Sequence, residues 1–365
     1  MKKIFIVFFW LISILIAIVW TYENPEKIES YKDNIKKNEK PKIKSLESDQ
    51  VFYTANSFEL SSKKIIDLKE KVAFIIYPDE QNKFDKGKLK IYTQSGFVIE
   101  NFKQKKLNLP KFFTLQRNGG VKTIISINEN NIALISGKEK NCFFASLVLL
   151  KEGKELLRTK CLPEKPKNND FNGLGSSNIH LDDFIYFTLG TPEKHMSKNS
   201  QLAQKDNYFF EKILKIKKED ILSKINNKIE TLDIEIYSKG HRVPQGLTKI
   251  NRSIFSVEHG PKGGDELNLV VKNGNYGWPL VSYGTNYLKE DGGDGKSIPS
   301  NHELNNFNEP LVALVPSIGI SSLNQCPSKL KNYYKKNCLM ALSLYGNNLR
   351  KGHSIIIFLL NNKMT

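Results

Sequence analysis

The stretch EHGPKGGDELN, from Glu258 to Asn268, combines three glycines, a proline and three carboxylates behind a short apolar run. The glycines allow backbone conformations closed to other residues and can turn carbonyl oxygens inward, and Pro261 has no amide hydrogen to compete with them. Asp265 and Glu266 add carboxylate oxygens. Carbonyls and carboxylates together are the ligands that Ca²⁺ selects. The stretch therefore predicts a calcium loop, with a tight acidic turn that ends a strand as the alternative.

A second polar group precedes this loop in the stretch GHRVPQGL, which holds Arg242 and Gln245. The guanidinium of an arginine is a planar fork suited to carboxylates, and a glutamine amide offers both a donor and an acceptor. Beside a calcium loop, these two residues could receive a flat polyanion that also chelates the metal. The alternative is an ion pair between Arg242 and Asp233 or Glu235.

Aromatic residues follow the loop in NGNYGWP and SYGTNY, which contain Tyr276, Trp278, Tyr283 and Tyr287. Aromatic side chains between glycines can form the walls of a site for a planar ligand. They also fill hydrophobic cores, which is their commoner role.

The elements that must position these residues are short strands. Apolar or alternating runs of four to eight residues recur between Gly, Asn, Asp and Lys turns, which predicts a mainly β chain. The best helical candidate is KKEDILSKINNKIE. A sandwich, a solenoid and a β-propeller are compatible with this pattern. The related stretches NNIALISG, DFIYFTLG and RSIFSVEHG favour a propeller and are predicted to be the inner strands of its blades.

The four cysteines fit an oxidising compartment. Cys142 and Cys161 flank a predicted hairpin, and Cys326 and Cys338 flank a polar loop, so this pairing closes two short loops. Two structural disulfides are expected, with two pairs of free thiols as the alternative.

The N-terminus carries a targeting segment. Lys2 and Lys3 precede a nearly unbroken apolar run over residues 4–20, so residues 1–22 are predicted to be a signal anchor or a cleaved signal peptide. Residues 23–50 are predicted to be a flexible Lys-rich tether, and residues 51–365 the folded domain. This order places the domain outside the cytoplasm, in the periplasm, anchored to the inner membrane.

The net charge of +17 does not predict a nucleic-acid ligand. The chain has few arginines, its lysines are spread along the sequence, and the predicted location excludes most nucleic acid.

The region from Gly240 to Tyr287 resembles the soluble glucose/sorbosone dehydrogenase family, the aldose sugar dehydrogenases that depend on pyrroloquinoline quinone (PQQ). The family's runs G-x-R-N-P-Q-G-L, E-H-G-P-x-G-G-D-E-L-N and N-Y-G-W-P-x-x-S-Y-G-x-x-Y match almost letter for letter, and PSIGIS at 316–321 adds support. The resemblance implies an all-β, six-bladed propeller with an incomplete last blade. It also implies a PQQ- and calcium-dependent enzyme that oxidises the C1 hydroxyl of a sugar and passes electrons to a respiratory acceptor.

The resemblance also implies a set of site residues. Arg242, Gln245 and Tyr287 match cofactor-binding positions. Glu266 and the carbonyls of Gly260, Pro261 and Tyr276 match calcium ligands.

Several positions depart from the family pattern. The base histidine is expected near Asn172 or Gly173, and neither residue can take a proton at neutral pH. Val243, Asn118 and Thr191 replace a family Asn, Gln and Asp, and the C-terminal R-I/V-R-D-V arginines are missing. Two functions therefore stay open: a quinoprotein sugar dehydrogenase, or a membrane-tethered, calcium-stabilised propeller that binds a sugar or protein without turnover.

Overall fold

The computed structural model describes residues 68, 70–76, 89–163, 169–192, 198–288, 298–344 and 354–361, and the strands over 44–46, 50–55 and 58–63. The chain divides into two units, Met1–Lys69 and Glu70–Thr365. The first unit contains one antiparallel sheet of β1 Lys44–Leu46, β2 Gln50–Ala55 and β3 Phe58–Lys63. The predicted tether therefore includes β1, and the predicted domain start at residue 51 lies within the first unit.

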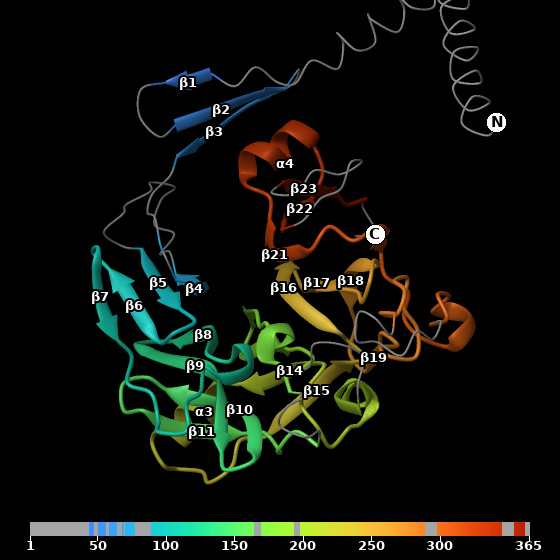
Figure 1. The fold of residues 1–365 in the computed structure, drawn as a ribbon. Coiled ribbons are helices and arrows are strands. Elements are labelled where there is room, and N and C mark those ends of the chain that lie inside the picture. The colour runs from blue at the N-terminus through green and yellow to red at the C-terminus, as the bar shows by residue number, and fades with distance from the viewer. Residues whose placement is uncertain are drawn as a thin grey trace, which may run out of the picture. The chain divides into compact units, whose positions relative to one another are not determined.

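Among its described residues, the second unit forms five sheets that follow one another in chain order except for β19, a short strand that returns to the third sheet (Figure 1). The strands are β4 Val72–Ile76, β5 Lys90–Thr93, β6 Phe97–Glu100 and β7 Lys103–Lys106 in the first sheet; β8 Val121–Ile127, β9 Asn130–Glu139, β10 Cys142–Leu149 and β11 Lys154–Arg158 in the second; β12 Asn178–Leu181, β13 Phe184–Leu189, β14 Lys212–Lys217, β15 Ile234–Lys239 and β19 Gly274–Asn275 in the third; β16 Val243–Ile250, β17 Ser253–His259, β18 Asp265–Val270 and β20 Val312–Leu314 in the fourth; and β21 Ile320–Gln325, β22 Cys338–Ser343 and β23 Ile355–Leu359 in the fifth. The helices are α3 Lys218–Ile225 and α4 Ser328–Tyr334.

Each sheet is a blade of an all-β propeller. Four hydrophobic clusters fill the four interfaces between consecutive sheets, for example Phe143 and Phe171 between the second and third sheets and Phe255 and Leu339 between the fourth and fifth. Burial of these apolar faces stabilises the stacking of each blade on the next. The prediction of an all-β propeller is confirmed.

The first strand of each sheet makes contacts with neighbouring sheets: β4 with β8, β8 with β12, β12 with β16, and β16 with β21. These strands therefore lie toward the centre. The prediction that NNIALISG, DFIYFTLG and RSIFSVEHG are inner strands is wrong, since they form the second strands β9, β13 and β17. Second strands are buried on both faces too, so an apolar run does not distinguish them from inner strands.

Left-handed turns join the first two strands of three consecutive blades. Asn128, Asp182 and Asn251 have φ of 52°, 52° and 53° at the β8–β9, β12–β13 and β16–β17 turns. Asn and Asp tolerate this conformation better than other side chains, which explains their recurrence at these turns.

Both predicted disulfides are present. Cys142–Cys161 closes the β10–β11 hairpin, and Cys326–Cys338 closes the loop that carries α4. The predicted helix within KKEDILSKINNKIE is α3. The predicted membrane segment at residues 4–20 lies outside the described residues, and within the described part of the chain no helix has the length and apolar character to span a bilayer.

Candidate active site

The hairpin of β17 and β18 places two carboxylates opposite each other. Glu258 on β17 pairs in register with Glu266 on β18, and both side chains are buried. The turn between the strands needs its glycines, because Gly263 and Gly264 have φ of 98° and 64° and a side chain at Gly260 would collide with their carbonyls. The glycine-rich loop therefore brings two buried carboxylates together.

Glu258 is well supplied with hydrogen bonds. Its Oε2 accepts from the backbone N–H of Arg242 at 2.8 Å, and its Oε1 accepts from Asn268 Nδ2 at 2.8 Å. His241 Nδ1 lies 3.3 Å from the same Oε1, and its ring stacks on that of Tyr276 with centroids 4.5 Å apart. Both oxygens of this buried carboxylate therefore have hydrogen-bond partners.

Glu266 has far fewer partners. Asn268 Nδ2 lies 3.3 Å from its Oε2, and the ring of His302 lies 3.7 Å from its Oε1. Burial and, next, the nearby charge of Glu258 raise the pKa of Glu266 well above its usual range. The charge of Glu266 is therefore less well compensated than that of Glu258.

Asp265 serves the structure of the loop. Its carboxylate accepts hydrogen bonds from the backbone N–H groups of Ile318 at 3.1 Å and Ile320 at 3.0 Å, from Gly260 at 3.2 Å, and from the Ser317 hydroxyl. It therefore ties the glycine-rich loop to the segment that enters β21.

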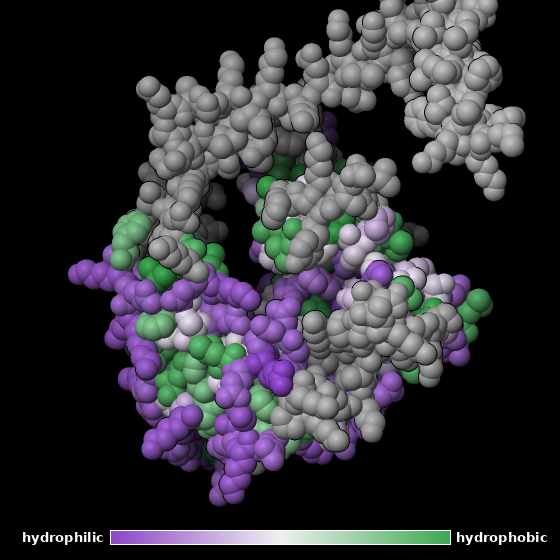
Figure 2. Space-filling view, in the orientation of Figure 1, coloured by the Kyte–Doolittle hydropathy of each residue, from purple (hydrophilic) through white to green (hydrophobic). Residues whose placement is uncertain are grey.

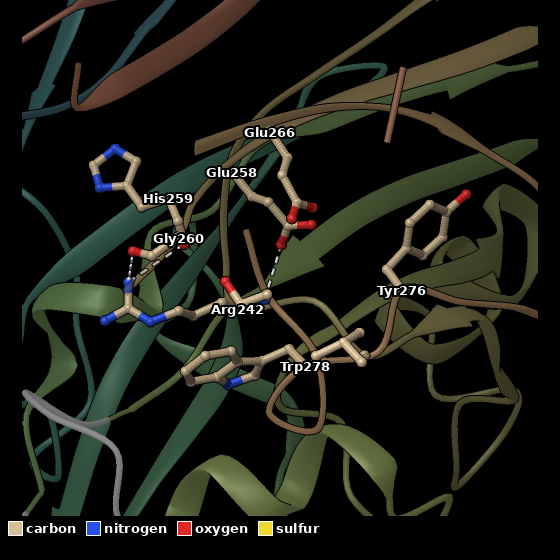
Figure 3. Close-up of a pocket in the computed structure, with 10 residues that line it drawn as sticks. Arg242, Glu258, His259, Gly260, Glu266, Tyr276 and Trp278 are labelled. Atoms are coloured by element: carbon tan, nitrogen blue, oxygen red, sulfur yellow. Dashed lines mark hydrogen bonds between the residues drawn. The ribbon is translucent and has the colours of Figure 1, made fainter. Parts of the chain in front are cut away.

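Arg242 lies between this loop and Trp278 (Figure 3). Its Nη1 donates to the carbonyls of Gly260 at 2.5 Å and His259 at 3.3 Å, and its guanidinium lies 5.3 Å from the centre of the Trp278 ring. Its buried Nε has no partner among the described residues. Glu235, one alternative partner, instead pairs with Lys215 and Lys272.

These groups line a small cavity. Arg242, Glu258, Gly260, Glu266, Tyr276 and Trp278 are among its lining residues, and its inner space is about 10 Å³. A space of this size holds roughly one water or one metal ion, and it is far smaller than the cavities that enclose organic ligands.

The region of the expected base lies beside this site. Gly173, in the 3₁₀ turn Phe171–Leu174, packs against Thr191, whose N–H donates to the carbonyl of Arg242 at 2.8 Å. Asp170 caps the turn by accepting from the N–H of Asn172 at 2.8 Å, and the Asn172 side chain is exposed.

The family model for glucose/sorbosone dehydrogenases matches residues 136–353. The chain belongs to the glucose/sorbosone dehydrogenase family. The predicted resemblance is confirmed, and the match includes every site residue described above.

Individual members of this family match over shorter lengths. Quinoprotein glucose dehydrogenase B of Acinetobacter calcoaceticus is 36% identical over 133 residues, which is 30% of this chain and 28% of the relative. Aldose sugar dehydrogenase YliI of Escherichia coli is 49% identical over 55 residues, 14% of this chain and 15% of the relative. The chain thus aligns with less than a third of the length of these curated relatives.

Solved structures share the fold of this family member. The apo form of the soluble aldose sugar dehydrogenase from Escherichia coli superposes with a TM-score of 0.54 at 18% identity, covering 80% of this chain and 83% of that chain. A structure titled glucose dehydrogenase gives a TM-score of 0.53, also at 18% identity, over 80% and 86% of the two chains. At this identity the likeness concerns the fold.

The structure gathers most of the residues that the family resemblance implies. Tyr287 donates from its hydroxyl to the carbonyl of Pro261 at 3.1 Å, and Arg242 donates to that of Gly260. Each carbonyl oxygen has a second lone pair, so these contacts leave acceptor capacity at both. Gln245 packs its amide against Gly175, close to the 3₁₀ turn of the expected base.

Asn118 and Lys122, from the segment before β8 and from β8 itself, hydrogen-bond to the same 3₁₀ turn and its capping residue. Asn118 Nδ2 donates to Asp170 at 3.0 Å, and Lys122 Nζ donates to the carbonyls of Asn118 at 2.9 Å and Phe171 at 2.7 Å. Burial lowers the pKa of Lys122 to about 8. These contacts hold the 3₁₀ turn Phe171–Leu174, where the sequence predicts the base position, against β8 and the segment before it.

Sequence reasoning missed Glu258, Asn268 and His302. Glu258 and Glu266 are equally far from the centre of the turn, so the hairpin spacing could have revealed that pair. Asn268 lies two residues beyond Glu266 on the same strand face, which the period of a strand also indicates. No sequence signal places His302, which comes from a distant loop.

Proposed function

We propose that this chain is a PQQ- and calcium-dependent aldose dehydrogenase built on a six-bladed ring. Family membership and the quinoprotein name of one relative support this function. The observation that carries it is the combination of two deficits at one cavity: the buried Nε of Arg242 has no partner among the described residues, and Glu266, paired with Glu258, has few hydrogen-bond donors. An anionic cofactor and a cation would satisfy these two deficits.

Calcium fits the residues around the cavity. Within the described part of the chain, no three His, Cys, Asp or Glu side chains are grouped closely enough to hold a metal by themselves. A cation here would therefore combine the Glu266 carboxylate with backbone carbonyls of Gly260, Pro261 and Tyr276. This all-oxygen set suits Ca²⁺, and a positive charge would remove the unfavourable approach of Glu258 and Glu266.

PQQ fits the surroundings of Arg242 less completely. The guanidinium, the Trp278 ring, Gln245 and Tyr287 supply a cation, an aromatic surface and hydrogen-bonding groups for a flat carboxylated ligand. The cavity has room for an ion only, so calcium would occupy the cavity and the quinone would lie outside it.

The reaction needs a hydride acceptor and a proton acceptor. Bound PQQ would accept the hydride from C1 of the sugar, and the hydroxyl proton must then pass to a base. The exposed amide of Asn172 cannot take it at neutral pH, and loss of a general base costs about 10²–10⁴ in rate. We therefore expect slow turnover.

The lack of a proton acceptor at Asn172 and Gly173 favours the second candidate function, which is a calcium-stabilised propeller that binds a sugar or a protein without turnover. Gly173 is crowded by Thr191, and its neighbour Asn172 is exposed and neutral. This turn therefore keeps the fold of the site without a group for proton transfer.

The proposed location is the periplasm, with residues 4–20 as an inner-membrane anchor and a respiratory electron acceptor as partner. The two disulfides support an oxidising compartment.

The test separates binding from turnover. Purified full-length protein is titrated with PQQ in the presence and absence of Ca²⁺ by calorimetry, and dye reduction is then followed with a panel of aldoses. Calcium-dependent PQQ binding with slow, sugar-dependent dye reduction is expected. Binding without dye reduction would favour the second function, and absence of any PQQ binding would refute the dehydrogenase.

A further inference from the structure

Acidic residues are absent from the C-terminal part of the sequence. Glu309 is the last of them, and residues 310–365 contain no Asp or Glu but seven Lys and Arg residues. This segment therefore contributes +7 to the net charge of +17 without any acidic residue beside its lysines and arginines. A sequence with a uniform lysine bias would still place acidic residues there.

Four of these cations lie in one loop, the basic knob Cys326–Cys338. The disulfide between its ends closes the loop, and α4 occupies its centre. Lys329, Lys335 and Lys336 are exposed, and Lys331 Nζ donates to Gln325. None of the four forms an ion pair with a described residue.

Exposed apolar side chains accompany this charge. Tyr333 of the knob is 49% exposed, and Leu342, Leu344, Ile355 and Leu359 of the same blade are each 45–46% exposed. Hydrophobic residues also gather over β21–β23 on the face drawn in Figure 2. Lysines alone would suit an acidic protein surface, whereas lysines beside tyrosine and aliphatic side chains suit the interface of an anionic bilayer.

The knob and the candidate active site lie at opposite ends of β21. The carbonyl of Ile320, at the start of this strand, accepts from His259 Nε2 at 2.5 Å. The strand ends at Gln325, directly before the knob. Five steps of a strand span roughly 17 Å, so a partner on the knob would leave the site open.

We propose that the basic knob docks on an anionic phospholipid surface. The expected anchor at residues 4–20 would hold the chain near such a surface, and stable membrane attachment commonly combines two signals of this kind. The proposal itself rests on the charge, exposure and position of the knob, and it does not depend on catalysis.

The first test is a lysine footprint on the full-length protein with vesicles. Acetylation of Lys329, Lys331, Lys335 and Lys336 is compared in phosphatidylglycerol and in phosphatidylcholine vesicles, with the exposed lysines of β7 as internal control. We expect about threefold or greater protection of the knob in the anionic vesicles alone, lost at about 0.5 M NaCl. Equal reactivity of the knob in both vesicles, or equal protection of β7, would overturn the proposal.

The second test uses two variants with the same charge loss. Lys329, Lys331, Lys335 and Lys336 are replaced by Gln in one, and Lys103, Lys105, Lys106 and Lys111 in the other. The readout is the partition coefficient into phosphatidylglycerol vesicles divided by that into phosphatidylcholine, because the N-terminal apolar run contributes to both. The knob variant should lower this ratio about tenfold and the control variant less than about threefold. A ratio near one for the unmodified protein would show no preference for the anionic lipid and overturn the proposal.

Discussion

Glu258 and Glu266 lie opposite each other in a cavity with room for about one water, yet they differ in their hydrogen-bond donors. Glu258 accepts from two N–H donors and lies 3.3 Å from a ring nitrogen of His241. Glu266 shares one of these donors, Asn268, and otherwise meets only a histidine ring at 3.7 Å. The charge of Glu266 is thus the least compensated in the site.

This imbalance predicts the behaviour of Glu266→Gln. The amide removes a buried carboxyl beside Glu258, so the metal-free protein should melt about 2–4 °C higher. It should also lose the rise in Tm that Ca²⁺ gives the unmodified protein. Thermal unfolding with EDTA and with Ca²⁺ measures both effects, and Glu303→Gln at an exposed position is the control. An unchanged calcium response would exclude Glu266 as a ligand.

Arg242 leads to a second prediction at this scale. Arg242→Lys keeps the charge but loses the planar fork that spans the loop carbonyls and lies against Trp278. PQQ affinity should fall about 10–100-fold, measured by titration calorimetry. The matched variant Arg252→Lys changes an exposed arginine paired with Asp182 and should bind as before. Equal affinities would remove Arg242 from the cofactor site.

Sequence reasoning was strongest where residues act locally. The loop glycines, Arg242 and Glu266 stand in one continuous stretch, and their chemistry is visible in their types. Asp265 was included with the calcium oxygens, whereas the structure shows that its Oδ2 accepts from the backbone N–H groups of a segment some fifty residues later and its Oδ1 accepts from Gly260 N–H and the Ser317 hydroxyl. Contacts between segments far apart in the sequence carry no local signature, and His302 was missed for the same reason.

At the scale of elements, the 3₁₀ turn Phe171–Leu174 decides whether a base can be introduced. Asn172→His should fold, since this side chain is exposed, and a restored base should raise sugar-dependent dye reduction by about 10²-fold or more. Gly173→His should destabilise the fold, because an added Cβ would lie 2.6 Å from the carbonyl oxygen of Thr191. We expect the latter to lose about 1–3 kcal/mol of stability in urea unfolding.

The two histidine variants control each other. If Asn172→His binds PQQ but reduces no dye, the base is not the limiting group. If Gly173→His is as stable as the unmodified protein, the packing of the turn against Thr191 is looser than the structure indicates.

The sequence predicts well which segments are strands. It predicts less well which position each strand takes within its blade. Two apolar runs around a short turn define a hairpin, which is why the Cys142–Cys161 pairing could be inferred from the sequence. The order of strands within a blade depends on contacts with neighbouring blades. Since β9, β13 and β17 are as apolar as inner strands, their sequences alone did not reveal that they are second in each sheet.

At the scale of the whole molecule, two buried lysines make unfolding sensitive to alkaline pH. Lys212 donates to the carbonyls of Leu202, Ala203 and Phe210, and burial lowers its pKa to about 8, as it does for Lys122 in the neighbouring blade. Both values lie below the usual 10.5 of the unfolded chain. From about pH 8 to pH 9 the unfolded chain binds more protons at these two lysines, so stability should rise with pH. At higher pH the tyrosines whose pKa is raised in the folded chain, such as Tyr276 and Tyr283, act in the opposite direction.

The measurement is urea unfolding across this pH range. Lys212→Met should remove about half of the slope, because Lys122 still contributes, while Lys205→Met at an exposed position should leave it unchanged. Stability that falls from about pH 8 to pH 9 in the unmodified protein would contradict the prediction.

The number of blades belongs to this scale as well. The second unit shows five sheets among its described residues, and the sixth blade remains part of the proposal. The fold class of the second unit could be predicted from strand length and turn spacing. Closure of a propeller ring, however, depends on how the first and last blades meet. Local patterns contain no information about that contact.

Asp265 and Glu266 are adjacent on one strand and therefore point to opposite faces. Asp265 accepts hydrogen bonds from backbone N–H groups, and Glu266 faces the cavity. A single inserted or deleted residue in the Gly260–Gly264 turn would exchange these two roles along the whole hairpin. The number of residues in this turn is thus more tightly constrained than the identity of most of its side chains. Insertions in the turn should be the most damaging sequence changes in the blade.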